Sequence, residues 1–110
     1  MSELSIMKII LNQKITKASI ESGTLILQGN SWYLTIKCAW HLIKDGNPLI
    51  SSWNPRDQDE ISSIISKDIL EINSQSPFFK NDPTIVFSEN FILQVFTVDF
   101  EYTWNFHSTI

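Results

Sequence analysis

The chain has 110 residues, of which 43% are hydrophobic and 18% are charged, and this composition excludes a disordered chain. Its length predicts one domain over residues 1–110. The net charge of −4 disfavours direct binding to the phosphate backbone of a nucleic acid.

At the N-terminus the sequence predicts one or two short strands, within Ile6–Leu11 and Ile15–Ile20. The first apolar stretch is too short for the core of a signal peptide, and no later stretch is long enough to span a membrane. The chain has a single cysteine, Cys38, which cannot form an internal disulfide bond and is typical of a protein in a reducing compartment. We therefore expect a cytoplasmic protein.

The most regular stretch is the run from Trp32 to Trp40, in which every second residue is apolar. Successive side chains of a strand point to opposite faces of the sheet, whereas a helix would scatter these apolar residues around its circumference. The pattern predicts one long strand whose buried face carries Trp32, Leu34, Ile36, Cys38 and Trp40.

Turn signals flank this strand. Gly29-Asn30 between two apolar runs is typical of a hairpin, with the glycine at a positive φ, and Asp45–Pro48 marks a second reversal. We expect strands at Thr24–Gln28 and Leu49–Trp53 on either side, so that Thr24–Trp53 forms a three-stranded antiparallel meander.

A helix is predicted near residues 57–66. Asp57 and Glu60 have the spacing of a capping box. One helical face is formed by the isoleucines of this segment, Ile61, Ile64 and Ile65. Because isoleucine lowers helix propensity, packing against the sheet must hold this helix in place.

The remaining chain predicts strands joined by short connections. Lys67–Asn73 alternates like a strand, although Ile69 also continues the helical face that precedes it. Asn73–Pro83 is polar apart from Phe78-Phe79 and is expected to be a loop. Three further strands, with Glu89-Asn90 as the turn after the first, are expected at Thr84–Ser88, Phe91–Val98 and Tyr102–His107.

From Ile92 to Phe106 the even-numbered residues are mainly apolar, and the odd-numbered residues from Thr97 onward are polar. This alternation predicts that the even-numbered side chains face the core and that the other face of the sheet meets water. Strands dominate, one helix is predicted, and βαβ alternation is missing. We expect a mainly β (α+β) fold, an antiparallel β-sheet or small β-sandwich with one short packed α-helix.

The sequence contains no pattern typical of a catalytic or metal site. Cys38 and His41 are three positions apart, so on a strand they point to opposite faces and do not form a nucleophile–base pair. A zinc site needs several ligands at characteristic spacings, which this chain does not supply. Asp57, Asp59 and Glu60 lack the glycine and final glutamate of a calcium loop, so a helix start is the simpler interpretation. We expect no catalytic residue, metal or cofactor; an enzyme with an unrecognised carboxylate pair is a weaker alternative.

The charge is unevenly distributed. Residues 1–55 have five lysines against three acidic residues, a net charge of +2, whereas residues 56–110 have three basic against nine acidic residues, a net charge of −6. Such an acidic half attracts a basic partner or keeps the protein soluble. Tryptophan is common both in cores and at interfaces: Trp32, Trp40 and Trp104 fit apolar faces, while Trp53 suits either role.

The segment from Gly29 to Gly46 has the spacing Trp-x-Leu-x-Ile, then Trp-x-Leu and a glycine turn, and it precedes a serine-rich strand ending at Trp53 and an acidic helix start. Over nearly the whole chain this order resembles a family of small bacterial domains, the immunity proteins of contact-dependent growth inhibition and related polymorphic-toxin systems. The chain has His41 where many of these relatives have an arginine.

The resemblance implies a cytoplasmic, non-enzymatic inhibitor that binds the C-terminal toxin domain of its cognate effector. Such toxins are often nucleases, and an acidic inhibitor can block their cationic substrate-binding surface. From the charge pattern, the expected contacts are carboxylates of the helix start and the last strands with two aromatic anchors: Trp53, Asp57, Asp59, Glu60, Asp99, Glu101 and Tyr102. The alternative is a structural or housekeeping protein-interaction domain with no toxin partner.

Overall fold

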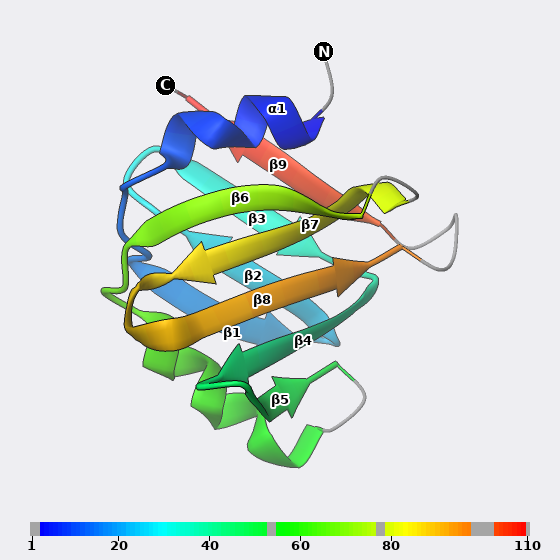
Figure 1. Ribbon diagram of the computed structural model, residues 1–110. Coiled ribbons are helices and arrows are strands. Elements are labelled where there is room, and N and C mark those ends of the chain that lie inside the picture. The colour runs from blue at the N-terminus through cyan, green and yellow to red at the C-terminus, as the bar shows by residue number, and fades with distance from the viewer. Residues whose placement is uncertain (1–2, 53–54, 77–78, 98–102, 110) are drawn as a thin grey trace.

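The computed structural model describes residues 3–52, 55–76, 79–97 and 103–109 (Figure 1). Two antiparallel β-sheets pack face to face, with short helices at their margins. The predicted class, a mainly β sandwich with a short packed helix, is confirmed. In chain order the elements are α1 (Glu3–Met7), η1 (Lys8–Ile10), β1 (Lys17–Glu21), β2 (Thr24–Gln28), β3 (Trp32–Ile36), β4 (Ala39–Lys44), β5 (Asn47–Ser51), η2 (Pro55–Ile64), β6 (Ile69–Ser76), β7 (Phe79–Phe87), η3 (Ser88–Asn90), β8 (Phe91–Phe96) and β9 (Trp104–Ser108).

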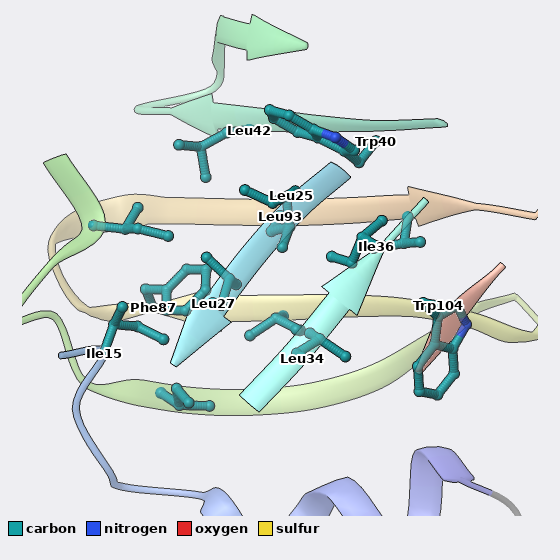
Figure 2. Packing of buried hydrophobic residues seen from close by; sticks show 14 of the residues in the cluster. Ile15, Leu25, Leu27, Leu34, Ile36, Trp40, Leu42, Phe87, Leu93 and Trp104 are labelled. Carbon is teal, nitrogen blue, oxygen red and sulfur yellow. The ribbon is translucent and has the colours of Figure 1, made fainter. Parts of the chain in front are cut away.

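The core lies between a four-stranded sheet, in the order β1-β2-β3-β9, and a five-stranded sheet, in the order β5-β4-β8-β7-β6. The strands of the two sheets cross obliquely (Figure 1). Figure 2 shows Leu25 and Leu27 of β2 pointing to the same interior as Phe87 of β7 and Leu93 of β8. The three tryptophans expected in the core are at most 4% exposed there: Trp32, Trp40 and Trp104.

The run 32–40 is not one strand, because β3 and β4 belong to different sheets and are separated by Lys37 and Cys38. Its five apolar side chains are all buried, since the alternation continues while the chain turns the corner between the sheets. The predicted meander over Thr24–Trp53 is therefore wrong. β2–β3 and β4–β5 form two hairpins, one in each sheet.

The predicted reversals occur, but Gly29 has a different role from the expected one. At the β4–β5 turn both Asp45 (φ 52°) and Gly46 (φ 81°) have positive φ, as a two-residue hairpin turn requires. Gly29 does not adopt a positive φ. Instead the indole of Trp32 lies directly over it, and a Cβ at position 29 would collide with that ring. Glycine is required here because two groups approach closely.

The strand predicted at Ile6–Leu11 is wrong, because this segment forms α1 and η1. Met7 and Ile10 are buried while Ile6 and Ile9 are 40% and 47% exposed, which is the spacing of a helix with one buried side. α1 lies along one end of the sandwich beside β6 and β9 (Figure 1). The second expected strand is present as β1.

The loop predicted over Asn73–Pro83 is also wrong, because most of it belongs to the β6–β7 hairpin, in which Ser74 pairs with Pro83. β6 is an edge strand of its sheet, and Asn73 and Ser74 are exposed. The polar composition that indicates a loop is here the composition of an edge strand facing water.

In β8 the buried residues are odd-numbered, Phe91, Leu93 and Val95, whereas the even-numbered ones were predicted. In β9 the prediction is right, since Trp104 is buried and the neighbouring odd-numbered residue Asn105 is exposed. β8 and β9 belong to different sheets, so one alternation does not run through both.

Candidate functional site

Asp59 and Glu60 are the predicted contact residues whose side chains the structure describes, and both are exposed on η2. Asp57 lies in the same helix, but its side chain is outside the described part of the chain. The other predicted contacts also lie outside the described residues: Trp53, Asp99, Glu101 and Tyr102.

η2 is a 3₁₀ helix, whereas an α-helix was predicted near residues 57–66. With three residues per turn, Ile61 and Ile64 lie on the same side of the helix and are 3% and 0% exposed. Ile65, expected on the same face, follows the helix and is only half-buried. η2 contacts β1 and β5, so it packs across the margins of both sheets.

Two serines fix the backbone that carries the acidic side chains. Ser62 Oγ donates to the carbonyl of Asp59 at 2.9 Å, and Ser63 Oγ donates to the carbonyl of Glu60 at 2.7 Å. Such bonds compete with a regular α-helical pattern. They leave the two exposed carboxylates on a backbone that is already ordered, so little further backbone entropy is lost on binding.

Most other described carboxylates already have partners. These pairs are Asp45 with Lys44 and Asn90, Asp68 with Lys14, Asp82 with Thr97, and Glu89 with Lys67. The hydrogen bond from Lys67 to Glu89, at 2.5 Å, holds the pKa of that carboxyl below its ordinary value.

Among the carboxylates whose side chains the structure describes, four have no hydrogen bond or ion pair: Glu21, Asp59, Glu60 and Glu71. Asp59 and Glu60 lie on η2, and Glu21 ends β1, which η2 contacts. Unpaired negative charge therefore gathers along β1 and η2. We call Glu21, Asp59 and Glu60 the acidic surface.

Two shallow, open grooves border this surface. Asp59 lines one of about 490 Å³, together with Ile20 and other residues of β1 and η2. Glu21 lines the other, of about 440 Å³, next to Lys17 and Ile65. Neither groove encloses a small molecule. Both leave the carboxylates free to accept hydrogen bonds from lysine or arginine side chains of a protein partner.

Cys38 lies in the core just before β4, whereas His41 lies on the outer face of the five-stranded sheet, so the two side chains diverge, as predicted. Cys38 is 6% exposed within the core, and burial raises the pKa of its thiol to about 11. His41 hydrogen-bonds through Nε2 to the side chain of Gln94 and meets the ring of Phe96 edge-on at 5.1 Å. A thiol this buried stays protonated and is a poor nucleophile.

Asp82 is a buried acid that sequence patterns do not single out, because it falls in the segment expected to be a loop. It is 6% exposed, and it accepts hydrogen bonds from the backbone N–H of Thr97, at 3.1 Å, and from the hydroxyl of the same residue. These bonds join β7 to the end of β8 and give Asp82 a structural role. Among the described residues, no three His, Cys, Asp or Glu side chains gather to hold a metal ion.

Comparisons of the chain with protein-family models, curated proteins and solved structures found no match. The helices in the described part of the chain are not long and apolar enough to cross a membrane. A function for this chain has therefore to be inferred from its own residues and their geometry.

Proposed function

We propose that the chain is an immunity protein of a contact-dependent growth inhibition system. It binds the C-terminal toxin domain of the cognate effector in the cytoplasm and neutralises it by covering a cationic, nuclease-type active-site surface. The observation that supports this best is the acidic surface, whose carboxylates are exposed and unpaired, two of them on a helix anchored by Ile61 and Ile64 in the core. The net charge of −6 in residues 56–110 supports it further.

The mechanism is binding without chemistry. A nuclease attracts phosphates through lysine and arginine side chains, and carboxylates held at the surface of another protein can take the place of those phosphates. Opposite charge accelerates encounter and disfavours wrong partners, while packed contacts slow dissociation. The serine bonds to the η2 backbone keep Asp59 and Glu60 in place before the toxin arrives.

The function is tested by expressing the toxin domain encoded directly upstream of this chain's gene, with and without the chain. The chain should restore growth, and the two proteins should co-purify as a complex. Rescue without co-purification, or no rescue, contradicts the proposal. A housekeeping interaction domain would give no rescue at all, and this outcome distinguishes the alternative function.

The acidic surface is tested in the purified complex with the double variant Asp59→Asn/Glu60→Gln. Its association rate at low salt should fall roughly 3- to 10-fold, and its rate should depend less on ionic strength. Glu71→Gln is the matched control, because Glu71 is also exposed and unpaired but lies on β6. Equal effects from both variants, or an unchanged salt dependence in the double variant, would exclude the acidic surface as the contact.

A further inference from the structure

The outer face of the five-stranded sheet has an apolar row that no other element of the described chain covers. Ile43 of β4 pairs with Ile92 of β8, which pairs with Val86 of β7. All three are half-buried and none packs against the core cluster. Leu70, 48% exposed, lies at the same end of the sheet. We call Ile43, Val86 and Ile92 the outer apolar row.

The row adjoins a shallow groove of about 540 Å³, to whose lining Leu70, Val86 and Ile92 contribute apolar side chains. The acidic residues Asp45 and Glu89 also line it. Both of these carboxylates are compensated within the chain.

Asp45 Oδ2 lies 4.0 Å from Lys44 Nζ, and Glu89 Oε2 lies 2.5 Å from Lys67 Nζ. This end of the sheet is thus apolar with balanced charges. It differs in both respects from the acidic surface on β1 and η2.

We infer that the chain forms a two-fold symmetric dimer through this outer face. β8 is the middle strand of the sheet, and a two-fold axis parallel to it places Ile92 against its own mate and Ile43 against Val86 of the other copy. The contact is self-complementary, as a closed dimer requires. Two stacked sheet faces of this kind interdigitate their apolar side chains.

The symmetry of the row about β8 favours a second copy as the occupant of this face, and local charge does not oppose it. Two chains of net charge −4 repel wherever unpaired carboxylates meet, and a basic partner is attracted to the acidic surface. Among the described residues that pair in register with the outer apolar row, Glu71 is the one unpaired carboxylate, and it pairs with Val86. The two-fold axis places each Glu71 opposite Asn47 and Pro48 of the other β5, so that like charges do not face each other.

The polar centre of the face is already bonded. The side chains of His41 and Gln94 next to the row are hydrogen-bonded to each other. Their burial in the dimer therefore does not cost that bond.

Sedimentation velocity and light scattering on the purified chain, from about 1 μM to about 1 mM, test the inference over the range of weak to moderate association. The expected result is a concentration-dependent dimer. Ile92→Lys should raise the dimer dissociation constant about 100-fold or more, because it places two ammonium groups together at the centre of an apolar contact. A chain that stays monomeric throughout this range overturns the inference.

Ile26→Lys is the matched control, since Ile26 is also half-buried and lies on the outer face of the other sheet, where Ser19 and Thr35 flank it in register. It should leave the dissociation constant unchanged, and near-UV circular dichroism should show both variants to be folded. Equal weakening by both lysines overturns the assignment to the outer apolar row.

A second measurement avoids charge altogether. The chain's one cysteine is buried, so Ile92→Cys adds a single accessible thiol next to the two-fold axis. Because stacked sheets lie about 10 Å apart, a thiol-specific crosslinker of comparable length should give a covalent dimer from Ile92→Cys but not from Ile26→Cys. The reverse pattern contradicts the inference, and neither result depends on the toxin-binding proposal.

Discussion

Gly29→Ala should destabilise the fold, although the position does not need a glycine backbone. Gly29 has no positive φ, so alanine by itself should stabilise the protein by about 0.5 kcal/mol through the unfolded chain. Against this, the new Cβ would overlap the Trp32 indole, with Cζ2 at 2.8 Å. Trp32 is 4% exposed and cannot swing away, and overpacking of this kind costs about 1–3 kcal/mol.

The net loss is about 0.5–2.5 kcal/mol of unfolding free energy, which for a domain of this size lowers Tm by roughly 2–20 °C. Urea and thermal unfolding followed by far-UV circular dichroism measure both quantities. A double-mutant cycle with Trp32→Phe isolates the contact, because a smaller ring leaves room for the Cβ. In that background Gly29→Ala should cost about 1 kcal/mol less than in the wild-type chain.

Gly23→Ala is the control, since Gly23 has a φ of 80° and no heavy atom within 4 Å of its would-be Cβ. Its cost comes from backbone strain alone, so Trp32→Phe should not change it. A Gly29→Ala variant as stable as the wild type, or one whose cost is the same in both backgrounds, would refute the close packing of the indole on the turn.

Three other predictions concern η2, the thiol and a surface ion pair. Ile64→Ala, at a fully buried position, should lower the unfolding free energy by about 2–4 kcal/mol in urea titrations, whereas half-buried Ile65→Ala should cost clearly less. Burial raises the pKa of Cys38 from 9.0 to about 11, so the unfolded thiol loses its proton first. Stability should therefore fall between these pH values by up to ~1.4 kcal/mol per unit, and Cys38→Ser should remove that slope. In NMR titrations Glu89 should titrate below the ordinary range of a glutamate, and Lys67→Met should move its pKa back up.

Local sequence patterns were sufficient to predict the hairpin turns and β2, but they did not predict to which sheet each strand belongs. Neither glycine nor proline marks the corner at Lys37-Cys38; the chain bends there because two sheets must enclose one core. Non-local packing also overrides local preference at the N-terminus. Ile9 and Ile10 are β-branched and favour a strand, yet the burial of Ile10 with Met7 is achieved by a helical segment.

The outer apolar row was missed for a related reason. β8 is the middle strand of its sheet and has apolar residues on both faces, with Leu93 and Val95 inside and Ile92 and Phe96 outside. Alternation carries no information when both faces are apolar. Only the burial of each side chain distinguishes the inner from the outer residues of β8, and burial is known only from the three-dimensional structure. Asp59 and Glu60 were named in advance because a run of acids at a helix start is visible in the sequence itself, whereas Glu21, which ends β1, was not.

The acidic surface and the outer apolar row share no residue, so the two proposed interactions should be thermodynamically independent. Substitutions at separate sites with no common partner have additive effects. Ile92→Lys should therefore leave the salt dependence of toxin association unchanged, and Asp59→Asn/Glu60→Gln should leave the dimer dissociation constant unchanged. The cycle is completed by measuring the toxin affinity and the dimer dissociation constant of both variants and of their combination. If Ile92→Lys alone weakens toxin binding, the outer face contacts the toxin, and self-association and neutralisation compete for one surface.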